Sequence, residues 1–369
     1  MDHQPKSIAV VLGTRPEIVK LGQIISLLGP AARTIHTGQH YDAGLSDIFF
    51  EQLGLSTPDI HLEVGGVSRG RQIGEAIAAL DGHFEVSRPD AVIVQGDTNT
   101  TCAAAVAANA REVPIVHIEA GLRSFDRAMP EEHNRVVTDH LADLLCAPTE
   151  TSRANLLAEG IPVERIVVTG NTVVESVHIL LPDANQRAEL LAGMDLHSDE
   201  FILSTFHRPE NVDDPETLAT ILDELVRLAW PVVLPLHPRS AQRAHDFGLD
   251  HLLAKMTVVE PIGLREFLGL AAESAFLVSD SGGVQEEASV LKRPVIVVRR
   301  STERPEVLGT FAERVLPGPG IGEIARGWMR DLEGLHEKLA QIPSPYGDGT
   351  ASRQSVEALE RFLGERRTA

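Results

Sequence analysis

The chain has 369 residues, of which 43% are hydrophobic and 23% charged, and its formal net charge is −20. This length fits two domains of ~150–200 residues each. The acidic balance argues against a nucleic-acid surface, because phosphate backbones require basic stripes. No run approaches the ~20 apolar residues needed to cross a membrane, and the N-terminus has no signal-peptide pattern. The two cysteines, Cys102 and Cys146, lie in apolar segments, which predicts buried thiols in a cytoplasmic protein and no metal site.

Short apolar, β-branched runs alternate with longer segments of helical spacing. In the first half, the runs that predict buried parallel strands are 8–13, 91–96, 114–119, 144–148 and 165–170. Between them, apolar residues recur at helical spacing over 17–28, 98–110 and 131–145. This alternation predicts an α/β fold, with a parallel sheet and helices on both of its faces.

The second half repeats this alternation. Its predicted strands are 201–206, 231–236, 256–261, 275–280 and 293–298, and its clearest helices are 215–229 and 281–292. The polar stretch 182–200 has the weakest strand signal, and we expect the hinge between two domains there. The tail 345–363 is a Gly/Pro turn followed by one amphipathic helix.

Ligands of open α/β sheets bind at the carboxyl ends of the strands. After the first strand comes the segment GTRPE, in which Gly13 allows close backbone approach and Arg15 lies where an anion would meet a helix N-terminus. A tight turn with an exposed arginine is the alternative. The segment contains no G-x-G-x-x-G, so a dinucleotide site is not predicted.

Acidic residues follow two further strands. Asp97 comes after 91–96, where it could cap the next helix in competition with Thr98 or Thr100. Glu119 lies directly at the end of a run that points into a buried sheet, where a carboxylate is harder to explain as structural.

A third acidic position begins the helix near 131. Glu131 and Glu132 both fall in its first turn, where the helix dipole favours acids, so one of the two can be purely structural. Acids on three successive loops at one sheet edge would repel one another. Such a cluster is retained when a proton must be held or moved near neutral pH.

The second half supplies cations at its strand ends. Ser281, Gly282 and Gly283 open a helix whose free N–H groups would form a phosphate cradle, and Glu286 follows one turn later. The cationic side chains predicted at the same edge are His207, Arg208, His237, Arg239 and Arg304. One such histidine is more often structural, but the whole set predicts a ligand that carries phosphate.

These segments together resemble one family. The chain is similar to the UDP-N-acetylglucosamine 2-epimerases in GTRPE (13–17), TGQHYD (37–42), QGDTNTT (95–101), HIEAGLRS (117–124), PEEHNR (130–135), TGNTVVE (169–175), HRPENVD (207–213), SDSGGVQEE (279–287), TERPE (302–306) and PYGDG (345–349). The resemblance implies a glycosyltransferase-B type fold of two Rossmann-like domains facing a cleft. It places an N-terminal domain at 1–180, a UDP-binding domain at 181–345, and a last helix at 346–369 that returns to the first domain.

The resemblance also implies an activity without a cofactor, in which UDP is eliminated from a UDP-N-acetylhexosamine and re-added after inversion at C2. The implied catalytic residues are Asp97, Glu119, Glu131 and His207. The implied substrate-binding residues are Arg15, His237, Phe267, Ser281, Gly282, Gly283, Glu286 and Arg304. Phe267 would stack on uracil, with core packing as its alternative, and a homodimer is implied as well.

Some members of the family bind a second, regulatory UDP-sugar. Gln39 and His40 match that site, and Arg69 or Arg71 could complete it, although the surrounding segment diverges. The chain also departs from the family's usual pattern at Pro209 and at Pro238-Arg239.

Three other functions remain open from the sequence. A hydrolysing relative would release UDP and free N-acetylmannosamine, a glycosyltransferase would pass the sugar to an acceptor, and a sensor would bind without catalysis. The retained acids and Gln39-His40 favour the non-hydrolysing epimerase.

Overall fold

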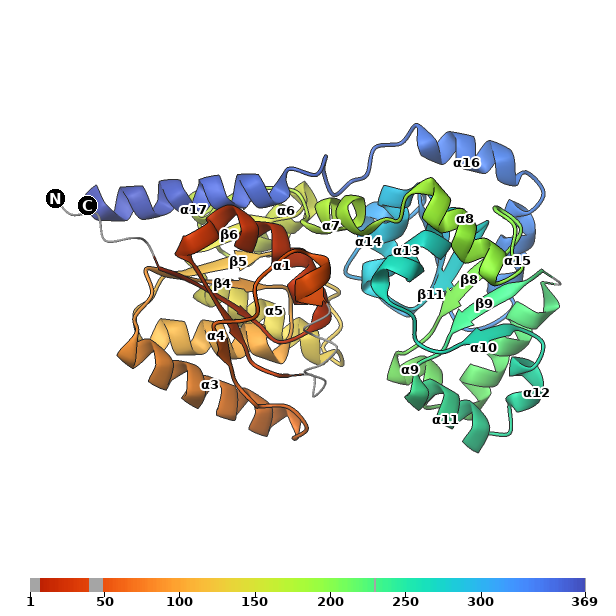
Figure 1. The fold of residues 1–369 in the computed structure, drawn as a ribbon, viewed down its shortest axis with the longest axis horizontal. Coiled ribbons are helices and arrows are strands. Elements are labelled where there is room, and N and C mark those ends of the chain that lie inside the picture. The colour runs from red at the N-terminus through yellow and green to blue at the C-terminus, as the bar shows by residue number, and fades with distance from the viewer. Residues whose placement is uncertain (1–6, 40–48, 229, 369) are drawn as a thin grey trace. The chain divides into compact units, whose positions relative to one another are not determined.

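The structure is a computed structural model that describes residues 7–39, 49–228 and 230–368 (Figure 1). The chain divides into two compact units. Unit 1 comprises Met1–Ile179 together with Tyr346–Ala369, and unit 2 comprises Leu180–Pro345. Each unit contains one parallel sheet with interleaved helices, which confirms the predicted α/β class.

Unit 1 is built on a sheet of order β3-β2-β1-β4-β5-β6-β7, parallel throughout. Its described strands are β1 (Ile8–Leu12), β2 (Ala32–His36), β3 (Ile60–His61), β4 (Ala91–Gln95), β5 (Ile115–Ile118), β6 (Leu144–Ala147) and β7 (Ile166–Val168). Residues of β1 and β4 are buried along their full length, as expected for strands covered on both faces. The strand order reverses between β1 and β4, which is where such sheets bind ligands.

Helices cover both faces of this sheet, with α3, α4 and α5 on one face and α1, α6 and α17 on the other (Figure 1). The described helices of unit 1 are α1 (Arg15–Leu28), α3 (Arg69–Val86), α4 (Asn99–Ala110), α5 (Pro130–Leu141), α6 (Glu150–Ala158), α7 (Val173–Leu180) and α17 (Ala351–Thr368). The last helix, α17, packs on α1. Its start is tied to α7, because Glu175 accepts a hydrogen bond of 2.9 Å from the Ser352 amide.

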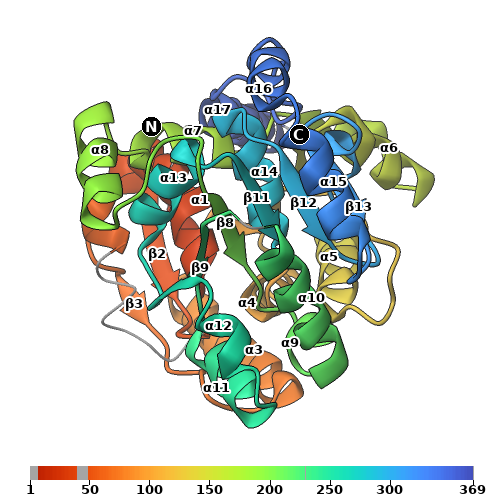
Figure 2. The ribbon, with the colours of Figure 1, turned by 90° about the vertical axis from the view of Figure 1, so that its right-hand side faces the viewer.

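Unit 2 repeats the topology with a sheet of order β10-β9-β8-β11-β12-β13. Its strands are β8 (Ile202–Thr205), β9 (Val232–Pro235), β10 (Thr257–Val259), β11 (Phe276–Ser279), β12 (Val295–Val298) and β13 (Ala312–Val315). Its described helices are α8 (Ala184–Gly193), α9 (Pro209–Val212), α10 (Pro215–Arg227), α11 (Pro238–Asp246), α12 (Asp250–Leu253), α13 (Leu264–Glu273), α14 (Gly282–Leu291), α15 (Gly320–Trp328) and α16 (Leu332–Ala340). The helix α14 begins just after β11 (Figure 2).

The division of the chain falls between Ile179 and Leu180, one residue before the boundary that the resemblance implied. The stretch 182–200, where a hinge was expected, contains α8, which starts with a capping box of Asp183 and Gln186. The sequence also did not predict β2, β3 or β13. The last of these has two exposed residues of four, so it lacks an apolar run.

Candidate active site

The carboxyl ends of β1, β4 and β5 are neighbours in the sheet of unit 1. They lead into Gly13, Asp97 and Glu119, so the topology places side by side three loops that are far apart in the sequence. At Gly13, an added Cβ would lie 2.2 Å from the hydroxyl oxygens of both Thr37 and Thr100. Only glycine therefore fits at the centre of this edge.

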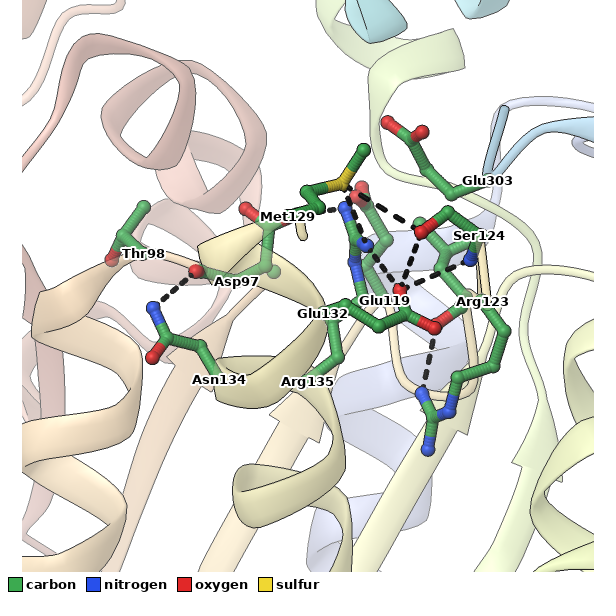
Figure 3. Close-up of polar contacts among 12 residues, drawn as sticks. Asp97, Thr98, Glu119, Arg123, Ser124, Met129, Glu132, Asn134, Arg135 and Glu303 are labelled. Atoms are coloured by element: carbon green, nitrogen blue, oxygen red, sulfur yellow. Dashed lines mark hydrogen bonds and ion pairs between the residues drawn. The ribbon is translucent and has the colours of Figure 1, made fainter. Parts of the chain in front are cut away.

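Asp97 does not cap the helix that follows it. Thr98 is the cap, because its hydroxyl accepts a hydrogen bond of 3.1 Å from the Thr101 amide. The Asp97 carboxylate instead contacts the Arg135 guanidinium, which also binds Glu132 at 2.7 Å and so lies between the two acids (Figure 3). The side chain of Asp97 keeps 26% exposure and can still be reached from solvent.

Glu119 has the left-handed backbone conformation, with φ of +68°, immediately after β5. This conformation is unfavourable for a residue other than glycine and is found where surrounding contacts enforce it. Its buried carboxylate contacts the Lys20 ammonium and accepts a hydrogen bond of 3.1 Å from the side-chain amide of Asn171. Residues from α1 and from the loop before α7 thus fix this carboxylate.

The two glutamates at the start of α5 differ in their surroundings. Glu132 is buried and accepts hydrogen bonds from the backbone amides of Ser124, at 3.0 Å, and Phe125, at 2.8 Å, so it is the structural member of the pair. Glu131 is exposed in the same first turn. Arg69 binds the Pro130 carbonyl at 3.2 Å and lies next to this turn.

A further carboxylate, Glu17, is buried behind the same edge. It accepts hydrogen bonds from the Gly13 amide and from the hydroxyls of Thr14, Thr98 and Thr101, at distances of 2.8 to 3.2 Å. Burial raises the pKa of Glu17 to about 7, although these hydrogen bonds lower it. Neutral donors alone therefore do not hold this group ionised across the physiological range.

In unit 2, Asp280 organises the loop after β8. Its carboxylate accepts hydrogen bonds from the amides of His207 and Arg208 and from the side chain of Asn211, and it lies 3.1 Å from Nδ1 of His207. Burial on its own would raise the pKa of Asp280, but these hydrogen bonds and the charge of His207 outweigh burial, so the pKa is lowered. His207 is held through Nδ1 while 52% of its side chain stays exposed.

The start of α14, where the sequence predicts a phosphate cradle, lies beside two charged side chains. Its N-cap, Ser281, makes no side-chain capping hydrogen bond. A Cβ added at Gly282 would lie 2.7 Å from an oxygen of Glu303 and 3.0 Å from Nη1 of Arg304. Arg304 in turn binds the buried Glu286 through Nε at 2.8 Å. These two predicted binding residues therefore contact each other beside the helix N-terminus.

The remaining predicted positions of unit 2 lie on separate helices. His237 is the exposed N-cap of α11, and its Nδ1 accepts a hydrogen bond of 3.2 Å from the Arg239 amide. The guanidinium of Arg239 binds Asp213. Phe267 is half-buried on α13, and it is not one of the residues that form the described core of unit 2.

The remaining predicted positions of unit 1 are distributed as follows. Arg15 is exposed at the start of α1, with its guanidinium carbon 5.8 Å from the centre of the Phe49 ring. Gln39 accepts a hydrogen bond of 2.9 Å from the Thr100 amide. His40 lies outside the described residues. Arg71 pairs with Glu75 on an exposed face of α3, so Arg69 is the arginine that reaches α5.

Several contacts of the predicted site residues were not expected from the sequence. The structure adds Lys20, Asn171 and Arg135 to the acids of unit 1, and Asp280 to His207 of unit 2. Within the described ranges, no group of three or more His, Cys, Asp and Glu side chains could hold a metal ion. Among the helices described, none is both long enough and apolar enough to cross a bilayer.

Comparison with known proteins identifies the family. The model of the UDP-N-acetylglucosamine 2-epimerases matches residues 30–360. The UDP-N-acetylglucosamine 2-epimerase of Methanocaldococcus jannaschii is 38% identical over 95% of this chain and 98% of its own. The UDP-2,3-diacetamido-2,3-dideoxy-D-glucuronate 2-epimerase of Pseudomonas aeruginosa is 37% identical over 96% of this chain and 99% of its own.

Comparison with solved structures points to the same family. The crystal structure of the Methanocaldococcus jannaschii enzyme in complex with UDP-GlcNAc and UDP has a TM-score of 0.86 at 38% identity, and it covers 96% of this chain and 99% of its own. The Neisseria meningitidis enzyme bound to UDP-GlcNAc has a TM-score of 0.87 at 32% identity, and it covers 96% of this chain and 100% of its own. The resemblance read from the motifs is confirmed, and this chain belongs to the UDP-N-acetylglucosamine 2-epimerase family.

Proposed function

We propose that the chain interconverts UDP-N-acetylglucosamine and UDP-N-acetylmannosamine by inverting C2, without an added cofactor. The observation that carries the proposal is a set of three carboxylates of unit 1 in a chain of this family: Asp97 after β4, Glu119 after β5, and Glu131 in the first turn of α5. One carboxylate removes the C2 proton while the C1–O bond breaks and its electron pair leaves with UDP, giving 2-acetamidoglucal. UDP then adds back to C1 as a proton is delivered to the opposite face of C2.

Unit 2 would hold the leaving group. The N–H groups at the start of α14 and the exposed face of His207 suit the β-phosphate, whose negative charge grows as the C1–O bond breaks. Arg15, His237, Glu286 and Arg304 are the further residues proposed to bind UDP. Phe267 is proposed to stack on uracil, which its half-buried position permits.

The proposal is tested by incubating the protein with UDP-N-acetylglucosamine in D2O and following proton NMR. Deuterium at C2 in a mixture of intact gluco and manno UDP-sugars is the expected result. Release of free UDP with free N-acetylmannosamine would assign the chain to the hydrolysing branch. UDP binding without any exchange at C2 would contradict both reactions and favour a transferase or a sensor.

A second substrate has similar support, because the diacetamido-glucuronate 2-epimerase of Pseudomonas aeruginosa is 37% identical to this chain and the Methanocaldococcus jannaschii enzyme 38%. The two substrates share UDP and the 2-acetamido group, and they differ at C3 and C6. Initial rates measured with both nucleotides under the same conditions decide between them.

We further propose a cytoplasmic homodimer with a regulatory UDP-sugar site at Gln39, His40 and Arg69. Buried, unpaired Cys102 and Cys146 accord with a reducing compartment. Light scattering at catalytic concentration tests the dimer. A sigmoidal dependence of rate on UDP-N-acetylglucosamine that is lost in Arg69→Ala tests the regulatory site.

A further inference from the structure

A buried histidine–aspartate pair lies behind the sheet edge of unit 1 that carries Asp97 and Glu119. The proposed reaction assigns no role to either residue of the pair. His117 is on β5 and Asp139 on α5, and both side chains have 0% exposure. Nδ1 of His117 lies 2.7 Å from Oδ1 of Asp139. Fully buried polar side chains are costly unless their partners are well placed, so this pair requires an explanation.

The pair joins two turns. Nε2 of His117 binds the carbonyl of Gly96 at 2.9 Å, in the turn that carries Asp97. Oδ2 of Asp139 accepts a hydrogen bond of 3.2 Å from the amide of Gly121, in the turn that carries Glu119. Both glycines have positive φ, +71° and +84°, so both turns are tight and depend on such contacts.

The partners of His117 and Asp139 fix the direction of each hydrogen bond of the pair. A carbonyl can only accept, so Nε2 of His117 donates to Gly96, and Nδ1 faces a carboxylate and donates to Asp139. Arg123 binds Asp139 at 2.7 Å and Glu159 at 2.6 Å. Burial alone would raise the pKa of Asp139, but the charges and hydrogen bonds of His117 and Arg123 outweigh it, so that pKa is lowered. Asp139 is thus held by His117 on one side and by Arg123 on the other.

We infer that His117 and Asp139 are positioning residues, which fix the spacing of the loops that carry Asp97 and Glu119. Neither side chain is placed to contact substrate, because both are fully buried. Their effect passes through the Gly96 carbonyl and the Gly121 amide to the neighbouring carboxylates. The inference rests on the proposed function, in which those two carboxylates handle the proton at C2.

Two variants test separately the two contacts of His117, the one with Asp139 and the one with Gly96. In His117→Asn, the side-chain amide takes the place of Nδ1 and retains the contact with Asp139, but the contact with Gly96 is lost. In His117→Gln, the amide takes the place of Nε2 and retains the contact with Gly96. Both leave Asp139 paired with Arg123, so they avoid the unpaired buried charges that Asp139→Asn would create.

Each variant is expected to lower kcat about 100-fold, the cost of misplacing catalytic groups by ~1 Å. KM and the Kd for UDP should stay within about twofold of the wild-type values, because the residues proposed to bind the substrate are unchanged. Leu80→Ala is the control, since Leu80 is fully buried in the same core and its truncation lowers Tm without touching either turn. The rate of each variant is measured at a temperature that lies the same number of degrees below its own Tm. Loss of kcat no greater than in Leu80→Ala, or a rise in KM alone, would overturn the inference.

Amide hydrogen exchange gives a measurement that does not depend on turnover. We expect faster exchange in the peptide around Gly96 for His117→Asn and in the peptide around Gly121 for His117→Gln, with neither change in Leu80→Ala. Unchanged exchange in both variants would also overturn the inference. An inactive wild-type chain would instead count against the proposed function, while exchange still decides whether the pair holds the two turns.

Discussion

Glu17 in unit 1 and Asp280 in unit 2 are both buried carboxylates behind the carboxyl edge of a parallel sheet, yet their pKa values shift in opposite directions. Neutral donors surround Glu17, and burial raises its pKa to about 7. Asp280 is also buried, but its contact with His207 and its hydrogen bonds outweigh burial and lower its pKa. The comparison shows that the sign of a pKa shift depends on the partners of the buried carboxylate, and burial alone does not decide it.

A second contrast concerns the residues proposed to act in the reaction. In unit 1, the acids Asp97 and Glu119 are held by Arg135 and Lys20. In unit 2, His207 is held by Asp280, and Arg304 by Glu286. Unit 1 therefore presents carboxylates that are held by cations, and unit 2 presents a histidine and an arginine that are held by carboxylates. The following variants test this complementary arrangement.

Replacing Glu119 by glutamine should have the largest effect, because it removes a proposed proton-transfer group and leaves Lys20 with a neutral partner. We expect kcat to fall about 1,000-fold, within the range for general acid–base groups. The Kd for UDP, measured by calorimetry, should stay near the wild-type value, because the residues proposed to bind UDP are mostly in unit 2. Glu112→Gln is the matched control, since Glu112 also has a left-handed backbone, with φ of +54°. Activity retained in Glu119→Gln would remove Glu119 from the reaction.

Glu17→Gln tests the raised pKa of the buried carboxylate that has only neutral hydrogen-bond donors around it. The pKa of Glu17 in the folded protein lies above its ordinary value of 4.5, so the folded state binds the extra proton and its stability falls as pH rises from about 4.5 to about 7. The full shift corresponds to stability on the order of 3 kcal/mol. The drop in Tm between pH 5 and pH 8 should therefore be smaller in Glu17→Gln than in the wild type. Equal drops would show that Glu17 titrates normally.

Asp280→Asn tests the support of a cation by a carboxylate. The amide cannot replace a charged acceptor for His207 and the two backbone amides, so we expect kcat to fall about 100-fold. The NMR resonances of the His207 ring should shift in the same variant. Asp214→Asn is the control, because Asp214 is an exposed helix cap and asparagine caps equally well. A wild-type rate in Asp280→Asn would mean that His207 needs no orienting partner.

The smallest effect is expected for Gly282→Ala. The new Cβ would lie 2.7 Å from Glu303 and 3.0 Å from Arg304, so it would displace side chains at the start of α14. We expect the Kd for UDP to rise about tenfold, which is 1.4 kcal/mol. In the control, Gly327→Ala, an added Cβ meets nothing within 4 Å and the Kd should not change. Equal affinities for UDP would place the phosphates elsewhere.

The sequence was sufficient for the class of fold and the family, because buried parallel strands are continuous apolar runs and the motifs have fixed order. It was insufficient where the pattern is short or polar. The edge strand β13 exposes Glu313 and Arg314, and β3 has only two residues. The stretch 182–200 lacks strand signal because it contains the capped helix α8.

The candidate site could be predicted only in part. Acids at the ends of strands are visible in the sequence, but the cations that hold them are not. Lys20 is one lysine within a helix, 99 residues before Glu119, and their contact depends on the order of strands in the sheet. The assignment of Glu132 as the structural glutamate likewise needed its contacts with Ser124 and Phe125, which no local pattern specifies.

The helix α17 belongs to unit 1 although it follows unit 2 along the chain. During translation, the ribosome therefore completes the continuous segment Leu180–Pro345 before it releases the helix that covers α1. Unit 2 can finish folding on the nascent chain, while unit 1 keeps apolar surface of α1 uncovered until α17 has been synthesised. The two halves of the enzyme would thus mature in the reverse of their order in the message.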